Sequence, residues 1–393
     1  MQQTWRWFGP EDAITLGEIA QTGAEGIVTA LHGIPYGEVW TEAAIAERQA
    51  LIASAPGGLR WSVVESLPVH EAIKRGEGRL DTLFGAWRDS LANLARRGIG
   101  TVCYNFMPIL DWTRTELRAP LASGGTALRF NAHQIAAFDC FMLERHGAEA
   151  EYAPALLARA RAWFDASDAA ARDTLLSSIM AGLPGAYDRY DIPGLNRILA
   201  GYAGIGRDAL RANLARFLRE VVPAAVELGV RLCIHPDDPP QPMFGLARIV
   251  SSEDDIGFIL DAVEHPANGL TLCTGSLGAG AGNDVPAIAR RFARRVWFAH
   301  LRNVTREADG SFMESAHLDG DVRMIEVIRI LLGEEARRRA AGVADWRIPM
   351  RADHGHALLD DAGRGSHPGY PLIGRLRGLA ELRGAMRALE DAA

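Results

Sequence analysis

The chain has 393 residues, enough for one (β/α)₈ barrel with insertions or for two smaller domains. Hydrophobic residues make up 48% and charged residues 23% of the chain, as in an ordinary globular protein. The net charge of −7 argues against nucleic acid as a partner, because nucleic-acid-binding proteins carry a basic face. No run of the sequence reaches the roughly 18 consecutive apolar residues that span a bilayer, so we expect no membrane partner either.

The cysteine content and the N-terminal segment point to the same compartment. The first residues, MQQTWRWFGPED, show no basic start followed by an apolar core, so no signal peptide is expected. The chain has four cysteines and no CxxC pair, which argues against a disulfide scaffold. We therefore expect a cytoplasmic protein, in which a free thiolate stays reduced.

Short β-rich runs alternate along the chain with stretches of helical periodicity, such as Leu80–Arg97. Alternation of this kind predicts parallel strands joined by right-handed helical crossovers, and eight units predict a closed barrel. An open doubly wound sheet is the alternative architecture. The eight predicted strands are Gly26–Leu31, Trp61–Glu65, Thr101–Phe106, Arg231–Ile234, Leu270–Cys273, Val296–Ala299, Phe312–His317 and Ile348–Arg351.

One interval, from Phe106 to Arg231, is longer than a single crossover helix needs. Within it, Ala127–Arg207 is rich in Ala, Arg and Leu, a composition typical of helices. We therefore predict a single TIM-barrel domain over residues 1–393, with a helical insertion at about residues 115–207 after the third strand. An insertion on the C-terminal face of the barrel is expected to act as a lid or as a contact in a homo-oligomer, most simply a dimer.

Four residues with metal-binding side chains stand at, or just past, the C-terminal ends of apolar runs: His235, Cys273, His300 and Asp353. In a barrel these strand ends converge on one mouth. A single histidine or cysteine in such a place is more often a packed or hydrogen-bonded residue. Two imidazoles, a thiolate and a carboxylate together form a full ligand set for a divalent transition metal, so we predict one metal site.

The remaining cysteines and the glycine-rich run are interpreted as structural. Cys103, Cys140 and Cys233 lie inside apolar or helical patterns and are expected to pack in the core. The run Gly275–Gly282 follows Cys273 but lacks the glycine spacing of a phosphate-binding loop. We expect it to form a mobile loop over the site.

Several long motifs, which follow one another along essentially the whole chain, resemble the mannonate dehydratase family. Enzymes of that family remove water from D-mannonate during the breakdown of hexuronates. The motifs are RWFGPED at 6–12, GIVTALHGIPYGEVW at 26–40, YNFMPILDWTRT at 104–115, CIHPDDPP at 233–240, LCTGSLGAG at 272–280, AHLRNV at 299–304, RADHGH at 351–356 and HPGYPLIGR at 367–375.

The resemblance implies a barrel like that of xylose isomerases, with Mn²⁺ or Fe²⁺ bound by the four ligands named above. It further implies that His354 and Tyr370 transfer protons. The stretch between these two residues is slightly longer than in compact members of the family. From ligand chemistry alone, Zn²⁺ or Fe²⁺ would be favoured, because Mn²⁺ is hard and a thiolate is a soft ligand.

Four further polar residues, Arg302, Asn303, Asn105 and Asp237, are candidates to bind the hydroxyls or the carboxylate of the substrate. Each has an alternative role, which is to support the metal ligands by hydrogen bonds. All four lie in or next to the motifs that follow predicted strands. Their positions therefore place them near the mouth without deciding between the two roles.

The function predicted from the resemblance is loss of water across C2 and C3 of D-mannonate, which gives 2-dehydro-3-deoxy-D-gluconate. The nearest alternative is a sugar isomerase or epimerase on a related metal-dependent barrel, and the thiolate in the ligand set disfavours it. A barrel that cleaves phosphodiesters in DNA is disfavoured by the acidic charge balance. A catalytically inactive barrel is the third alternative.

Overall fold

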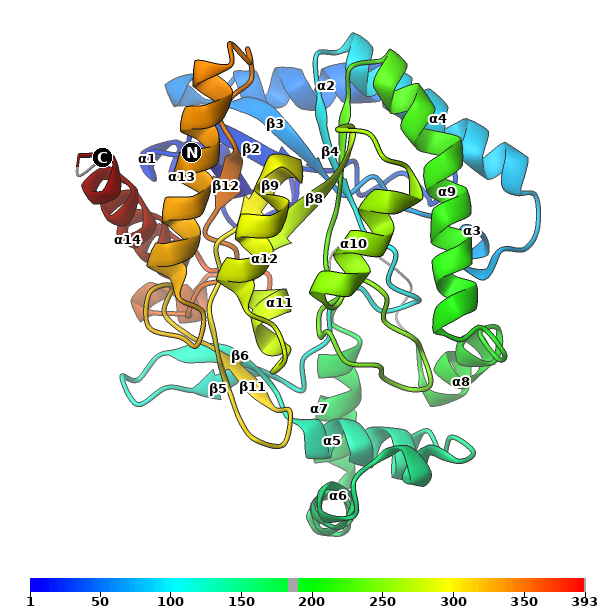
Figure 1. Cartoon of the computed structure of the whole chain (residues 1–393). Helices are drawn as coiled ribbons and strands as arrows, with labels where there is room; N and C mark the ends of the chain where they lie inside the picture. Colours follow the sequence, from blue (N-terminus) through cyan, green and yellow to red (C-terminus); the bar gives the residue numbers. More distant parts are fainter. Residues whose placement is uncertain (183–189, 392–393) are drawn as a thin grey trace.

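The computed structural model describes residues 1–182 and 190–391. Eight parallel strands form a closed barrel (Figure 1), which confirms the predicted TIM-barrel fold. Around the barrel the order is β1, β2, β3, β4, β7, β8, β9 and β12. The strands are β1 (Gln2–Arg6), β2 (Gly26–Thr29), β3 (Arg60–Glu65), β4 (Thr101–Tyr104), β7 (Arg231–Ile234), β8 (Asn268–Cys273), β9 (Val296–His300) and β12 (Pro349–Arg351).

Helices connect the barrel strands and pack on the outside of the barrel (Figure 1). None of the described helices has the length and apolarity needed to cross a bilayer. The helices that follow barrel strands are α1 (Leu16–Gln21), α2 (Glu42–Ala53), α3 (Glu71–Arg75), α4 (Leu80–Arg96), α9 (Arg207–Glu227), α10 (Glu253–Ala262), α11 (Thr274–Ala279), α12 (Val285–Phe292), α13 (Met324–Ala340) and α14 (Leu372–Asp391).

The first barrel strand, β1, is one that the sequence pattern did not predict. It pairs with β2 on one side and with β12 on the other, and so closes the barrel. Trp5 therefore lies within a barrel strand and not ahead of the first one. The segment QQTWR contains one large apolar residue and has no helix before it, so its local pattern gives little indication of a strand.

The predicted strand Phe312–His317 does not belong to the barrel. Its first part forms β11 (Phe312–Glu314) in a separate antiparallel sheet with the order β10-β11-β6-β5. Along β11 the residues are buried, half-buried and buried in turn. Such alternation is typical of an antiparallel strand with one covered face, whereas the parallel barrel strands are buried on both faces. The other strands of this sheet are β5 (Glu116–Pro120), β6 (Thr126–Phe130) and β10 (Val304–Arg306).

The long segment before β7 follows the fourth barrel strand, β4, and not the third, because β1 was missed. It begins with β5 and β6 where the sequence pattern predicted helix, and residues 183–189 of it lie outside the described part of the chain. Its helices then follow in chain order, ahead of α9. They are α5 (Ala132–Ala137), a π-helical turn (Phe138–Met142), α6 (Pro154–Ala166), α7 (Ala169–Ile179) and α8 (Ile192–Ala200).

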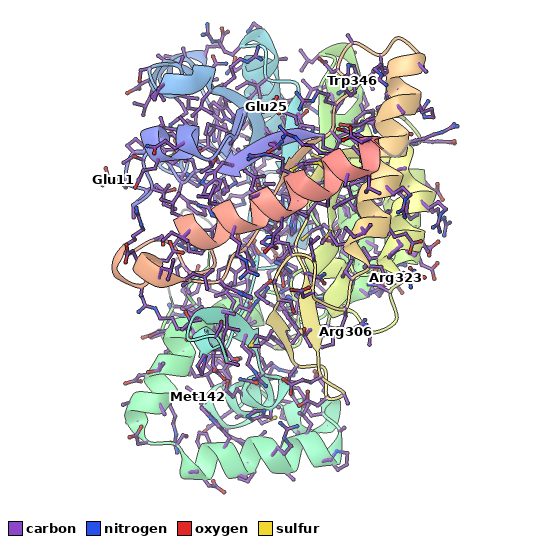
Figure 2. All side chains as sticks on the ribbon, turned by 90° about the vertical axis from the view of Figure 1, so that its left-hand side faces the viewer. Glu11, Glu25, Met142, Arg306, Arg323 and Trp346 are labelled. Atoms are coloured by element: carbon purple, nitrogen blue, oxygen red, sulfur yellow. The ribbon has the colours of Figure 1, made fainter. Side chains whose placement is uncertain are left out.

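This added segment lies at the C-terminal ends of the barrel strands. Figure 2 shows Met142 at the opposite end of the molecule from Glu25 and Trp346, which stand just before β2 and β12. In Figure 1, helices α5, α6 and α7 extend from the barrel on the same side as β5, β6 and β11. The additions therefore border the face on which barrel enzymes carry their active sites.

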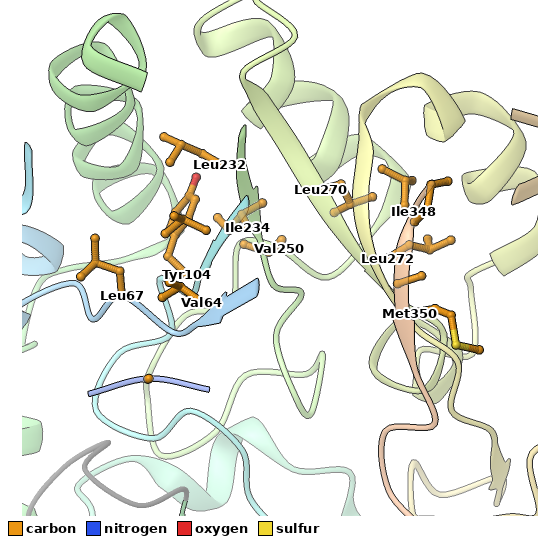
Figure 3. Close-up of a cluster of buried hydrophobic side chains, with 14 of the residues drawn as sticks. Val64, Leu67, Tyr104, Leu232, Ile234, Val250, Leu270, Leu272, Ile348 and Met350 are labelled. Carbon is orange, nitrogen blue, oxygen red and sulfur yellow. The ribbon is translucent and has the colours of Figure 1, made fainter. Parts of the chain in front are cut away.

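Successive side chains of a barrel strand point to opposite faces, and they form two separate apolar layers. On β7, Leu232 and Ile234 belong to the large core between the strands and the helices, part of which Figure 3 shows. The residue between them, Cys233, packs inside the barrel in a small cluster with Cys103 and Phe298. Both cysteines are fully buried, in agreement with the packing role expected from the sequence.

Candidate active site

The four predicted ligands come from one arc of the barrel mouth. His235 directly follows β7, Cys273 ends β8, His300 ends β9, and Asp353 stands two residues after β12. These strands are consecutive around the barrel, although they are far apart in the sequence. Parallel pairing therefore brings the four side chains together at one edge of the mouth.

The ligand atoms of His235, Cys273 and His300 all lie within 4.8 Å of one another, which makes this cluster a possible metal site. The Nε2 atom of His235 is 3.0 Å from Nδ1 of His300. The Oδ2 atom of Asp353 is 3.9 Å from Sγ of Cys273 and 3.8 Å from Nδ1 of His300. Two imidazole nitrogens, a thiol and a carboxylate gathered this closely form a donor set that fits a divalent transition metal.

A narrow cavity of about 30 Å³ adjoins this cluster. A space of this size is large enough for water. Six of the predicted site residues line the cavity, together with seven residues that were not predicted. The lining residues are Glu65, Ser66, Asn105, Met107, Asp111, Trp112, His235, Asp238, Arg302, Arg351, Asp353, His354 and Tyr370.

His354 and Tyr370 lie side by side in the wall of the cavity. Their rings meet edge to face with centroids 5.1 Å apart, and the ring of Trp112 is 6.0 Å from that of His354. Burial, together with the nearby carboxylate of Asp353, raises the pKa of Tyr370 well above its usual value. The phenol therefore keeps its proton near neutral pH.

A network of buried ion pairs surrounds His354. Arg302 donates to Asp238 at 2.7 Å, and Arg114 donates to Asp238 and to Glu314, each at 2.8 Å. Glu314 Oε1 in turn lies 3.0 Å from Nδ1 of His354. Burial acts to raise the pKa of Glu314, but Arg302, His354 and Arg114 outweigh it and lower that pKa to about 2.

A second group of buried charges reaches the predicted ligand Asp353. Arg351 donates to Asp353 and, at 2.9 Å, to Glu65, whose other oxygen is 3.4 Å from Arg6. Arg302 joins the two groups, because its Nη1 atom is 3.4 Å from Asp353 as well. The eight charged side chains therefore form one continuous chain of contacts around the mouth.

Gly275 shows how closely this network is packed. The sequence pattern predicted a mobile loop after Cys273, but Thr274–Ala279 forms the short helix α11, in which every residue is buried. A Cβ atom on Gly275 would lie 1.9 Å from Nε of Arg302. Only glycine leaves room for the arginine at this position.

Two of the predicted substrate-binding residues, Asp237 and Asn303, lie outside the cavity lining. Asp237 Oδ2 accepts hydrogen bonds from the backbone N–H groups of Ile249 and Val250, both at 2.7 Å. Asn303 donates to the carbonyl oxygen of Val322 at 3.0 Å and accepts from its N–H at 2.9 Å. The structure therefore gives both residues a role in holding loops, whereas Asn105 and Arg302 line the cavity.

Several residues of the site were not predicted from the sequence, although the sequence contains evidence for some of them. Glu65 ends an apolar strand, which is the same signal from which the metal ligands were predicted. Asp238 and Arg351 lie within motifs that were already singled out, next to residues that were chosen instead. Arg114 also lies within such a motif, at 104–115. Glu314 lies outside the motifs, and a strand outside the barrel, β11, brings it to the mouth.

Comparison with known proteins identifies the family of this chain. The family model described as D-mannonate dehydratase (UxuA) matches residues 1–393. The chain belongs to this family. It is 58% identical over 394 residues to a mannonate dehydratase of Chromohalobacter salexigens, with all of both chains covered. It is also 51% identical over 395 residues to a mannonate dehydratase of Rhizobium meliloti, covering 100% of this chain and 98% of the relative.

Solved structures agree with this assignment. The mannonate dehydratase of Streptococcus suis serotype 2 superposes with a TM-score of 0.77 at 33% identity, covering 100% of this chain and 94% of the other. A xylose isomerase domain protein of Alicyclobacillus acidocaldarius superposes with a TM-score of 0.51 at 13% identity, covering 99% of both chains. The second likeness shows that this chain shares the barrel fold of that protein.

The low pKa of Glu314 predicts how stability depends on pH. An ionised Glu314 stabilises the folded chain above its unfolded pKa of 4.5, and this contribution is lost as the pH falls through the folded pKa of about 2. We expect Glu314→Gln to lower the free energy of unfolding at pH 7. The difference from the wild type should shrink as the pH falls below about 4.5. Urea unfolding at pH 7, 5, 4 and 3 measures this, and a difference that does not change with pH would contradict it.

Proposed function

We propose that this protein removes water across C2 and C3 of D-mannonate and forms 2-dehydro-3-deoxy-D-gluconate. The divalent metal required for the reaction is bound by His235, Cys273, His300 and Asp353. The observation that carries the proposal is the match to the D-mannonate dehydratase family over the whole chain. The cluster of imidazole, thiol and carboxylate groups at the barrel mouth supports it.

The chemistry has two difficulties that the site must meet. C2 is bonded to the carboxylate carbon. Removal of the proton from C2 therefore builds negative charge on a carboxylate that is already anionic. A bound divalent cation supplies Lewis-acid stabilisation of that charge. Hydroxide is a poor leaving group, so the oxygen on C3 must receive a proton as the bond to carbon breaks.

His354 and Tyr370 are the groups that we propose for the two proton transfers. Both line the cavity, and their rings are in contact. Burial and Asp353 raise the pKa of Tyr370, so its phenol carries the proton that we propose it donates to the departing hydroxyl group. His354, held by Glu314 and Arg302, is then left to accept the proton from C2.

The other polar groups of the cavity position the substrate in this proposal. Arg302 offers a guanidinium group that suits the carboxylate, and Asn105 offers an amide that suits a hydroxyl group. The charged side chains around the cavity are buried, and charged contacts are stronger in buried surroundings than in water.

The metal that we propose is Mn²⁺ or Fe²⁺. Imidazole and thiolate ligands suit Fe²⁺, whereas Mn²⁺ prefers oxygen ligands. Asp353 supplies one such oxygen, and a substrate carboxylate would supply another. Cys273 is therefore the ligand on which the choice between the two metals depends.

The proposed reaction is tested with the purified protein, D-mannonate and either Mn²⁺ or Fe²⁺. We expect formation of a 2-keto acid that NMR identifies as 2-dehydro-3-deoxy-D-gluconate. An isomerised or epimerised sugar acid without any keto acid would instead support the alternative function. Protein treated with a chelator is the control and should be inactive until metal is restored.

Replacement of Cys273 by alanine tests the metal site. Because the change removes a direct ligand, we expect metal affinity to fall by more than the roughly 10–100-fold that loss of a supporting residue costs, and activity to fall with it. Metal analysis and chelator competition measure the first effect. Cys140→Ala changes a half-buried cysteine of the π-helical turn and should leave both unchanged. Wild-type metal affinity in Cys273→Ala would exclude the thiolate as a ligand.

Replacement of Tyr370 by phenylalanine tests the proton donor. Loss of a group that transfers a proton in the transition state should lower kcat on the order of 10²–10⁴-fold, while metal affinity stays unchanged. The matched control is Tyr152→Phe. The phenol of Tyr152 donates a hydrogen bond of 2.8 Å to Asp139 and does not line the cavity. A kcat close to that of the wild type would remove Tyr370 from the mechanism.

A further inference from the structure

The two ring nitrogens of His300 face different groups. On one side, Nδ1 is 3.0 Å from Nε2 of His235 and 3.8 Å from Oδ2 of Asp353, so it points into the ligand cluster. On the other side, Nε2 is 3.4 Å from Oε1 of Glu65. Both His300 and Glu65 are buried, with 0% and 4% of their surfaces exposed, so water cannot replace this contact easily.

A neutral imidazole carries a single proton, and only the other nitrogen has a lone pair for a metal. A carboxylate beside Nε2 favours the proton at that nitrogen and leaves the lone pair on Nδ1, which faces His235 and Asp353. We propose that Glu65 is a positioning residue that fixes the tautomer and the orientation of His300, and thereby raises the affinity of the site for a divalent cation. The inference rests on the proposed metal site but not on the identity of the substrate.

Glu65 is itself held in place from two other strands. It receives a hydrogen bond of 2.9 Å from Arg351 on β12, and Arg6 on β1 lies 3.4 Å from its second oxygen. Arg351 also contacts the proposed ligand Asp353. One guanidinium group therefore aligns both the carboxylate that binds the metal and the carboxylate that orients His300.

A second role for Glu65 must be separated from the proposed one. The carboxylate also neutralises two buried arginines, and removal of one partner from a buried ion pair is strongly destabilising. If Glu65 served only this structural purpose, its loss would lower stability and leave the metal affinity of the folded protein unchanged. Metal affinity, measured without substrate, therefore distinguishes the two roles.

The test compares Glu65→Ala and Glu65→Gln with the wild type by titration of the metal-free proteins with Mn²⁺. We expect the alanine variant to bind about 10–100-fold more weakly. The glutamine variant keeps an oxygen that can accept a hydrogen bond from Nε2, and it should recover most of the loss. Asp255→Asn is the matched control: it changes a buried carboxylate that pairs with Arg207 and Arg211, and it should bind like the wild type.

A measurement on the unmodified protein decides the question even if a variant fails to fold. In Zn²⁺-loaded protein with ¹⁵N-labelled histidine, NMR should show the metal on Nδ1 and the proton on Nε2 of His300. The inference is overturned if the metal sits on Nε2, or if folded Glu65→Ala binds Mn²⁺ as tightly as the wild type. A protein that binds the metal as described but does not dehydrate D-mannonate would overturn the proposed reaction and leave this inference standing.

Discussion

The mutual neutralisation of buried charges at the barrel mouth is the constraint on which the site depends. Removal of a charge from water costs several kcal/mol in free energy, and an ion pair recovers this cost only when its geometry is good. Four arginines and four carboxylates meet this requirement together, since each contacts a residue of opposite charge. They are Arg6, Arg114, Arg302, Arg351, Glu65, Asp238, Glu314 and Asp353.

This balance has a consequence for the chemistry. The four arginines and four carboxylates offset one another, so the network itself leaves no excess negative charge for a divalent cation. The carboxylate of a sugar acid, as in the proposed function, would add such a charge. The network also fixes the groups that the proposed reaction uses, because Asp353 lies between Arg351 and Arg302, and His354 contacts Glu314 and Arg302.

The elements added to the barrel complete the site. Glu314 belongs to β11, and Arg114 and Trp112 precede β5, so all three reach the mouth from outside the barrel. The rings of Phe130 and Phe312 stack with centroids 5.2 Å apart where β6 meets β11. The antiparallel sheet therefore joins the segment after β4 to the segment after β9 and presents both to the cavity.

Local sequence pattern was sufficient for the alternation of strands and helices, and for the choice of His235, Cys273, His300 and Asp353 as residues that the fold brings together. Periodicity is a property of neighbouring residues, and the C-terminal ends of parallel strands always meet at one mouth. Tertiary structure decided which strands close the barrel, since the pairing of β1 with β12 joins the two ends of the chain. It also decided that Asp238, and not its neighbour Asp237, faces the cavity. Adjacent acidic residues in one motif are equivalent in sequence, and only the positions of distant arginines and backbone N–H groups give them different roles.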